Sequence, residues 1–491
     1  MIDTSVVYLD SVIFLNNPFL IKIKNSKTRY DLLILGLLIL INGIVLSNAI
    51  RHTPYKGYDG VQHARNIEVI ATGRLPSPSD SREFFSPPLP YLLPALLLRT
   101  TGVDLDMAGK VAQILNVFLS IGVTVFLLKI CELTHPSQPH IKRNVLLFLA
   151  ILPVYYKTFA FVRGEPYIVF FTLVSSYQSL QVIAEGKISF RRMIGLGITL
   201  GLAVLARQWG VLLIPPIVAF LSLMTFKARL GWLRLLGGLT ICFGLCFLIS
   251  GWFYLYLKAN YGSLTTFNRQ PYARFSFSNQ PASFYFGLGN GNLFREPVRE
   301  AFANQLMPTF YSEIWGDYWF YFLVYGKDKR NDDLFAGLTL YEMLRRDHQP
   351  RWFRTNRSTI APYLARLNIV GLFPTGLALA ALVLGMVESL RYLFDPSPSL
   401  QRASVGLFML LISVSLLGYL WFLIMYPNNL GDTIKATYML HLFPLISVFV
   451  GRLMVWIRNR SLLTYRVLLY FVGFVLLHNL PAFFSRFSGG G

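Results

Sequence analysis

Residues 31–49 read DLLILGLLILINGIVLSNA, with Asp31 as the only charged side chain. An α-helix rises about 1.5 Å per residue, so about 20 apolar residues cross the hydrocarbon core of a bilayer. This stretch predicts a transmembrane helix, and similar apolar runs recur along the chain. The fold class that follows is all-α, a polytopic membrane protein with about 11 transmembrane helices. We expect the further spans at 108–130, 144–162, 166–184, 193–206, 209–226, 235–257, 367–390, 404–425, 439–457 and 464–483.

The composition supports a membrane protein. The 491 residues are 54% hydrophobic and 14% charged, with a mean hydropathy of +0.50, whereas soluble domains carry about 25% charged residues. This excludes an ordinary soluble enzyme, a disordered or fibrous protein and a disulfide scaffold. The cysteines Cys131, Cys242 and Cys246 lie in or at the end of apolar runs, which is typical of small core residues rather than of disulfides or zinc ligands.

The formal net charge of +21 has two explanations. Basic residues accumulate in cytoplasmic loops and near anionic headgroups. Alternatively, the chain binds an anionic ligand such as a lipid phosphate. Nucleic acid is not expected as a partner, because the basic residues are spread between the spans and do not form one domain.

The basic turns predict the orientation of the spans. Lys22, Lys24, Lys27 and Arg29 precede the first span, so we expect the N-terminus on the cytoplasmic side. The other turns expected on that side contain Lys142, Arg143, Lys187, Arg191, Arg192, Lys227, Arg229, Arg234, Arg391, Arg402, Arg458 and Arg460.

The outer side then holds the loop 50–88, a tight turn at 163–166 and a long loop at 258–366. Residues 89–98 are apolar but too short to cross, which predicts a helix at the membrane surface. We therefore expect an N-terminal membrane module over 1–260, an outer loop region over 258–366 and C-terminal transmembrane helices over 367–491.

Ionisable residues cluster near the expected outer ends of the spans. They are Lys157, Arg163, Glu165, Arg207 and Lys435. An ion-coupled transporter needs such groups near the middle of the bilayer, whereas an enzyme acting at one membrane surface needs them at one end. The pattern favours an enzyme.

Asp59 and His63 are four residues apart in the first outer loop, so on a helix they share one face. The carboxylate could act as a general base on a sugar-acceptor hydroxyl or ligate a metal. The alternative is a helix N-cap followed by a solvated face.

Arg163 and Arg207, near the ends of two spans, each have a structural and a functional interpretation. Arg163 and Glu165 either pair only with each other or supply a phosphate anchor and a second acid. Arg207, followed by Gln208, either extends its head to the surface or binds a phosphate bidentately.

Lys435 and Tyr438 open a later span. A cation at a helix start opposes the helix dipole, and a bound phosphate would resolve the conflict. The alternative is an interfacial lysine beside an aromatic-belt tyrosine. Elsewhere, Asp104 and Asp106 form a D-x-D string in which capping of the next helix is the expected role. The aromatic run 313–322 either packs at the interface or stacks on a sugar.

In their order along the chain, these features resemble the GT-C superfamily of membrane glycosyltransferases. The most similar branches are the dolichyl-phosphate-mannose-protein mannosyltransferases and the bacterial lipid A aminoarabinose transferases. Asp59 matches the catalytic acid of the first loop, although Gly60 follows where relatives often carry Glu. Residues 87–91, PPLPY, resemble the family's PPLYY-like stretch, and residues 163–165 match its second acidic turn.

Later motifs add to the resemblance. Residues 206–208, ARQ, are similar to the FRQ motif of the dolichol-pathway glucosyltransferases, and Lys435 with Tyr438 resembles the late motif near the family's phosphate site. The resemblance covers residues 30–260 well and 405–450 loosely. It implies a GT-C-like arrangement of the helices.

The resemblance implies an inverting glycosyltransferase that moves a sugar from a polyprenyl-phosphate donor to an acceptor on the outer face of the membrane. Asp59 would be the general base, and Glu165 would orient the acceptor or a metal. The carboxylates allow a divalent metal but do not require one. The substrate-binding residues would be His63, Arg163, Arg207, Gln208, Lys435 and Tyr438.

The other expected partners are membrane lipids and an acceptor that is a protein, a lipid or a glycan. The compact chain favours a bacterial inner membrane, and the endoplasmic reticulum is the corresponding membrane in a eukaryote. Two alternatives stay open. One is a carrier or flippase for lipid-linked sugars, and the other is a non-catalytic subunit of a membrane complex.

Overall fold

The computed structural model describes residues 26–228, 231–299, 301–325, 351–395, 399–484 and 487–488. Within these ranges the chain is helical, apart from a two-residue parallel pairing of β1 (Val324–Tyr325) with β2 (Phe487–Ser488). The described part contains 9 helices that are long and apolar enough to cross a membrane, so the chain is a multi-pass integral membrane protein. They are α2 (Ser26–Arg51), α5 (Leu105–Thr134), α8 (Glu165–Ala184), η2 with α10 (Gln208–Leu213 and Ile214–Ala228), α11 (Trp232–Tyr261), α15 (Arg351–Phe394), α16 (Leu400–Met425), α17 (Leu442–Arg460) and α18 (Leu462–Phe484).

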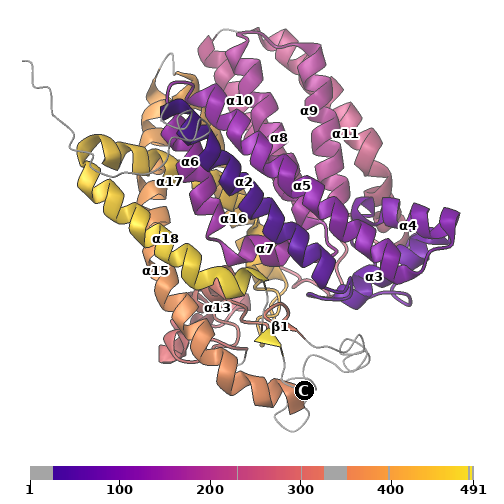
Figure 1. The fold of residues 1–491 in the computed structure, drawn as a ribbon. Coiled ribbons are helices and arrows are strands. Elements are labelled where there is room, and N and C mark those ends of the chain that lie inside the picture. Colours follow the sequence, from indigo (N-terminus) through magenta and orange to yellow (C-terminus); the bar gives the residue numbers. More distant parts are fainter. Residues whose placement is uncertain are drawn as a thin grey trace, which may run out of the picture.

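Two of the expected spans are not among these 9 helices of the described ranges. The segment 144–162 is divided into α6 (Pro139–Ala150) and α7 (Pro153–Ala160). Proline has no backbone N–H, so Pro153 cannot continue the hydrogen bonds of α6. The segment 193–206 forms α9 (Phe190–Ala206), which has 17 residues and ends where Arg207 turns to extended backbone. Both segments nevertheless run along the bundle beside the longer helices (Figure 1).

The two ends of the bundle differ in character (Figure 1). At its upper end are the turns between α5 and α6, α8 and α9, α10 and α11, α15 and α16, and α17 and α18. We call this the basic end, because it carries Lys142, Arg143, Lys187, Arg191, Arg192, Lys227, Arg234, Arg391, Arg402, Arg458 and Arg460. The side chains of Lys22, Lys24, Lys27, Arg29 and Arg229 lie outside the described part of the chain.

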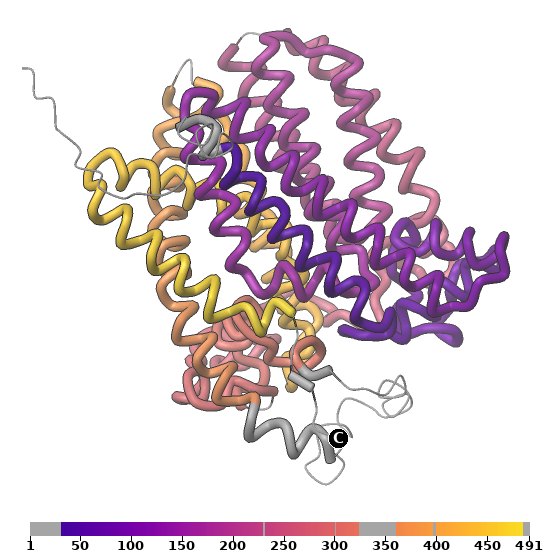
Figure 2. The backbone as a smooth tube through the Cα atoms, in the orientation of Figure 1, coloured from indigo at the N-terminus to yellow at the C-terminus, as the bar shows by residue number. Residues whose placement is uncertain are grey.

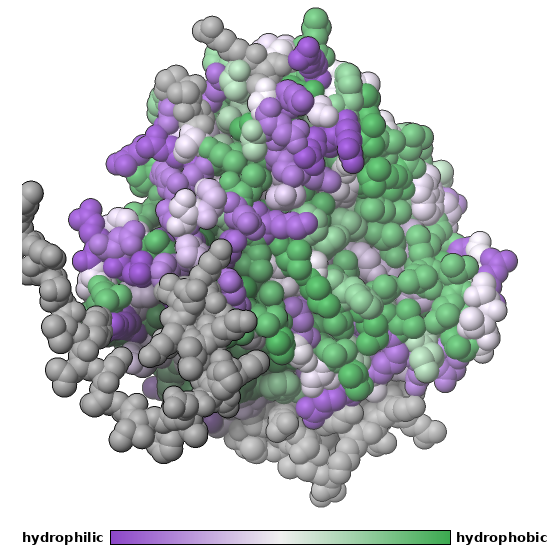
Figure 3. All heavy atoms as spheres, turned by 45° about the horizontal axis from the view of Figure 1, so that its top comes forward, coloured by the Kyte–Doolittle hydropathy of each residue, from purple (hydrophilic) through white to green (hydrophobic). Residues whose placement is uncertain are grey.

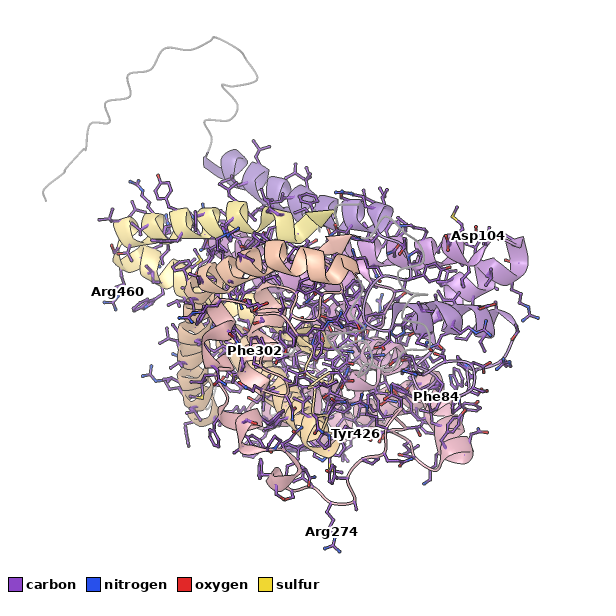
Figure 4. The ribbon with its side chains drawn as sticks, turned by 90° about the horizontal axis from the view of Figure 1, so that it is seen from below. Phe84, Asp104, Arg274, Phe302, Tyr426 and Arg460 are labelled. Atoms are coloured by element: carbon purple, nitrogen blue, oxygen red, sulfur yellow. The ribbon has the colours of Figure 1, made fainter. Side chains whose placement is uncertain are left out.

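The opposite end, here called the site end, is covered by short helices and loops. The first loop contributes α3 (Gly60–Ala71) and α4 (Leu89–Thr101), and α4 is the short helix expected from residues 89–98. The long loop after α11 contributes η3 (Phe277–Asn279), α12 (Ala282–Phe286), η4 (Gly289–Phe294) and α13 (Leu306–Trp315), and η5 (Ala436–Met439) precedes α17. Figure 4 views the molecule from this end and labels Phe84, Phe302 and Tyr426 from three of its segments.

The bundle and the site end each have a hydrophobic core. The main hydrophobic core runs through the bundle and contains the buried, free cysteines, as predicted. A second core lies at the site end, where Phe302, Tyr318 and Trp319 from the long loop pack near Tyr58 and Phe161. Apolar residues also cover the outer flanks of the helices (Figure 3). The first and last described helices lie side by side (Figure 2), joined by a 2.7 Å hydrogen bond from Asn48 Nδ2 to the Phe483 carbonyl.

Candidate functional site

Five segments that are distant in sequence meet at the site end. They are the turn 52–59 after α2, the stretch 81–88 before α4, the turn 161–164 between α7 and α8, the junction at Arg207 and the segment 431–438. The long loop after α11 also reaches this place, because the ring of Phe267 lies 4.7 Å from that of Phe85. Asp59, Arg163, Arg207 and Lys435 are carried by these segments, and Glu165 is the first residue of α8.

Asp59 is presented by a tight turn. Its backbone is left-handed, with φ 55°, and its side chain makes no capping bond to α3. Gly60 is required next to it, because a Cβ at that position would lie 2.0 Å from the Tyr55 carbonyl oxygen. The Asp59 side chain is 41% exposed, and its Oδ2 lies 3.4 Å from Lys435 Nζ. The carboxylate is therefore accessible and paired with a lysine that comes from 376 residues later in the chain.

Arg163, Glu165 and Arg207 form one buried ionic group. Arg163 donates to both oxygens of Glu165, from Nε at 3.0 Å and from Nη2 at 3.2 Å. Arg207 Nε lies 3.1 Å from Glu165 Oε1. Arg163 also donates to the Tyr58 carbonyl at 3.2 Å, which ties this group to the turn that carries Asp59. Glu165 thus holds two guanidinium groups beside the first loop.

Gly164 permits this close approach. A Cβ at Gly164 would lie 2.2 Å from the Ala206 carbonyl oxygen and 3.3 Å from Arg207 Cβ. Gly164→Ala should push the two backbones apart and lower the free energy of unfolding by about 1–3 kcal/mol, the usual cost of overpacking. Thermal unfolding in detergent measures this. Gly186→Ala is not a clean control because Gly186 has positive φ, whereas Gly36→Ala meets open space. An unchanged stability of Gly164→Ala relative to Gly36→Ala would contradict the packing argument.

Tyr438 lies at the centre of the cations. Arg163, Arg207 and Lys435 each place their charged group 5.7 Å from the centre of its ring. Lys435 also lies 4.8 Å from the ring centre of Tyr58. Aromatic faces attract cations, so the two tyrosines hold three positive charges in a small space. Such a cluster suits a ligand with a concentrated negative charge.

Glu83 is a site residue that the sequence analysis missed. It is buried, its Oε2 accepts a 2.9 Å hydrogen bond from Ser86, and the same oxygen lies 3.7 Å from Arg207 Nη1. Arg207 in turn donates to Ser86 Oγ at 2.9 Å. The first outer loop thus provides a second carboxylate at the site, 24 residues beyond Asp59. The only signal in the sequence is an acidic residue shortly before residues 87–91.

His63 and Gln208 lie at the edges of the group. His63 is buried and its Nδ1 is 2.6 Å from the Tyr91 hydroxyl. Gln208 Nε2 donates to the carbonyls of Phe85 and Thr266, at 3.2 and 3.1 Å. Both side chains hold segments of the site end together. Within the described residues, neither makes a hydrogen bond to Asp59.

A second buried ionic group joins α7 to the long loop. Lys157 Nζ is 2.8 Å from Glu313 Oε2, and that oxygen also accepts the hydroxyl hydrogen of Tyr58. Asp317 Oδ2 accepts from the backbone N–H groups of Phe322 and Leu323, at 2.7 and 2.9 Å. The carboxylates of the run 313–322 therefore fix the loop and Tyr58 rather than face solvent.

Two cavities meet at Tyr438. The first has a volume of about 400 Å³ and is polar, and it is lined by Asp59, Glu83 and Lys435 together with Arg82, Arg269, Asp432, Trp319 and Tyr321. The second has a volume of about 180 Å³ and is an apolar groove, lined by Arg207 and Gln208 together with Trp209, Val211, Leu212 and Trp421. Phe267 and Tyr438 line both.

The charges set the protonation states in the polar cavity. Desolvation favours the neutral form of Asp59, but the charges of Lys435 and Arg163 outweigh it and lower the pKa of Asp59 to about 2. Burial raises the pKa of Glu83, and the nearby charge of Asp59 adds to this effect. These two carboxylates of the cavity lining therefore differ, because Asp59 stays ionised and Glu83 holds a proton more readily, while the third lining carboxylate, Asp432, pairs with Arg269.

The D-x-D string is separate from this site. Asp104 caps α5, with Oδ1 accepting a 2.8 Å hydrogen bond from the Met107 N–H, as expected from the sequence. The described part of the chain holds no group of three or more His, Cys, Asp or Glu side chains arranged for a metal ion.

Comparison with known proteins gives one structural similarity. No protein-family model and no curated protein matches the chain. The chain is similar in structure to ArnT. A crystal structure of ArnT from Cupriavidus metallidurans bound to undecaprenyl phosphate aligns with a TM-score of 0.40 and 13% identity, over 94% of this chain and 78% of that one. The apo structure of the same protein aligns with a TM-score of 0.36 and 14% identity, over 87% and 78%. ArnT is a GT-C membrane glycosyltransferase.

Proposed function

We propose that this chain is a GT-C-type glycosyltransferase that transfers a sugar from a polyprenyl-phosphate donor to an acceptor at the site end. The observation that carries the proposal is the meeting of the polar cavity with the apolar groove at Tyr438, beside three cations. A lipid-linked sugar has the matching order of parts: an apolar tail, a phosphate and a polar ring.

The donor's tail would lie in the apolar groove between η2 and α16. Val211 and Trp421 line this groove and are also exposed on the flank of the bundle, at 44% and 48%, so the groove opens toward lipid. The phosphate would then lie near Tyr438, between Arg207 on the groove side and Lys435 on the cavity side. The sugar and the acceptor would occupy the polar cavity, where Trp319 and Tyr321 offer aromatic surfaces.

Asp59 would act as the general base. The acceptor oxygen forms a bond to the anomeric carbon while the bond from that carbon to the phosphate oxygen breaks, and the acceptor proton passes to Asp59. Attack opposite the leaving group inverts the anomeric configuration. Polyprenyl phosphate leaves with the electron pair, and the cations stabilise its charge. No general acid is required, because this leaving group is already a stable anion.

Glu165 would act through the arginines. Its two oxygens are taken by Arg163 and Arg207, so its role would be to fix the phosphate-binding guanidinium groups. This is a narrower role than the one implied by the family resemblance, in which it orients the acceptor or a metal. His63 and Gln208 would similarly hold the segments that surround the substrates.

Lys435 should control the pH dependence. The pKa of Asp59 is about 2 in the free protein, so the base stays ionised and kcat/KM should be flat from about pH 5 to about pH 8. In Lys435→Met the main cation that lowers the pKa of Asp59 is gone, so the acidic limb should move to higher pH. Profiles of kcat/KM for both proteins check this. Superimposable profiles would show that Lys435 does not set the ionisation of the base.

The experiment that tests the function uses the full chain in detergent with a radiolabelled polyprenyl-phosphate sugar. A glycosyltransferase releases free polyprenyl phosphate in step with transfer of the label, whereas a carrier or a structural subunit releases none. Asp104→Asn is the matched control, because Asp104 caps α5 outside the cavity. A panel of hexose and pentose donors without any release above that of protein-free micelles would refute the proposal.

The orientation follows from the charge of the two ends. The positive-inside rule would place the basic end in the cytoplasm and the site end on the outer face. The membrane would be the inner membrane of a bacterium, with the donor and the membrane lipids as partners, or the endoplasmic reticulum in a eukaryote. The acceptor would be a protein, a lipid or a glycan with a free hydroxyl or amine.

A further inference from the structure

A third cavity lies at the basic end, away from the site described above. It has a volume of about 620 Å³ and is formed by the C-terminal parts of α15 and α17 and the first residues of α16 and α6. Arg391, Arg402 and Arg452 line it, with Glu388 as its only lining carboxylate among the described residues. The proposed transfer reaction uses none of these residues.

The charges in this cavity are incompletely balanced. Arg452 Nη2 lies 2.7 Å from both oxygens of Glu388, and Arg402 Nη1 lies 2.7 Å from Asp395 Oδ2. Arg391 has no side-chain hydrogen bond or ion pair with any described residue. Arg391 lies in the last turn of α15 and is exposed, so its guanidinium is accessible to a ligand. The cavity thus has room and one uncompensated positive charge for an anion.

The lower wall of the cavity is apolar and faces outward. Leu384 and Val387 line it and are 50% and 40% exposed on the flank of α15, where acyl chains would contact the protein. Trp456 stands at the opening, 55% exposed, with the Arg460 guanidinium 5.5 Å from its ring centre. Tryptophan and arginine mark the level of the lipid headgroups. Hydrophilic residues gather over this end of the molecule and give way to the apolar flank in Figure 3.

We propose that this cavity binds an anionic membrane phospholipid. Its phosphate would lie against Arg391, between the ion-paired Arg402 and Arg452, and an acyl chain would follow the wall formed by Leu384 and Val387. The opening to the flank favours a lipid over a soluble phosphate compound, because the apolar wall continues directly from the cationic part of the cavity. Basic pockets between transmembrane helices on the cytoplasmic side are suited to such headgroups.

Native mass spectrometry of the full chain tests the site. The detergent-solubilised protein is titrated with phosphatidylglycerol and with phosphatidylcholine of the same acyl chains. We expect phosphatidylglycerol to bind about five- to tenfold more tightly, as for one basic residue that faces an anionic headgroup. Arg391→Gln should reduce its affinity to that of phosphatidylcholine. Arg234→Gln is the matched control, because Arg234 is exposed at the same end and does not line the cavity.

Three outcomes would overturn the site. The first is equal binding of the two lipids to the unmodified protein. The second is that Arg391→Gln and Arg234→Gln bind phosphatidylglycerol over phosphatidylcholine with the same preference. Arg391→Lys is measured as well, because a lysine at this position keeps the positive charge and should keep the preference. The third is competition by free glycerol phosphate at the same concentration as the lipid, which would identify a soluble anion as the ligand. Since lipid binding is read directly, failure of the glycosyltransferase proposal would leave this test unaffected.

Discussion

Asp59→Asn is expected to reduce sugar transfer about 10²- to 10⁴-fold, the usual contribution of a general base. Asparagine has the size of aspartate but cannot accept the acceptor proton. The side chain is 41% exposed and has one ion-pair partner, Lys435, at 3.4 Å, so the substitution should change stability little. Initial rates of labelled-sugar transfer, at saturating donor, measure the effect.

The interpretation depends on two further measurements. Asp104→Asn should transfer at the rate of the unmodified protein, and the unfolding temperature of Asp59→Asn should match that of the control. If Asp59→Asn transfers sugar at a rate within about twofold of the control, Asp59 is not the general base. In that case Glu83→Gln becomes the decisive variant, because Glu83 also lines the cavity, whereas the remaining lining carboxylate, Asp432, is paired with Arg269.

Glu165→Ala is expected to lower the free energy of unfolding by about 3–5 kcal/mol, the cost of removing one partner from a buried ion pair. The Glu165 side chain is 2% exposed, and the side chains of Arg163 and Arg207 are 1% and 7% exposed. Without the carboxylate, two positive charges face each other away from water. Chemical unfolding in mixed micelles, followed by tryptophan fluorescence, measures the loss.

The other end of the same helix supplies the control. Glu185 caps the C-terminus of α8 and pairs with Arg192, but these side chains are 32% and 34% exposed. Water screens such a pair, so Glu185→Ala should cost about 1 kcal/mol or less. Equal losses for the two variants would mean that the Glu165 group is open to water and does not organise the site.

Most of the bundle is predictable from the sequence because a membrane span requires a long apolar run, and such runs are local. Nine of the expected ranges correspond to helices long enough to cross. One continuous span was expected at 144–162, but the structure has two helices there. The apolar pattern continues through Pro153, whereas the helix is interrupted before it. At 193–206 the apolar run predicts the helix correctly, but Arg207 ends α9 after 17 residues, two fewer than α17, the shortest of the candidate spans.

The site is less accessible to sequence reasoning because its contacts are not local. The predicted outer ends of the spans placed Arg163, Arg207 and Lys435 on one side of the membrane, and the structure brings them around Tyr438. Glu83 could not be found in this way, since its position depends on how a polar loop folds against Arg207. The contact between Tyr58 and Glu313 joins residues 255 positions apart, and no periodic pattern encodes such a pair.

The pairing of the first and last described helices bears on biogenesis. The Asn48 amide donates to the carbonyl of Phe483, within α18, which the ribosome makes after every other helix described. Until α18 inserts, that amide lacks its partner inside the bilayer, where an unmatched polar group is costly. The contact that closes the first helix against the last therefore forms only after every other described helix has been synthesised.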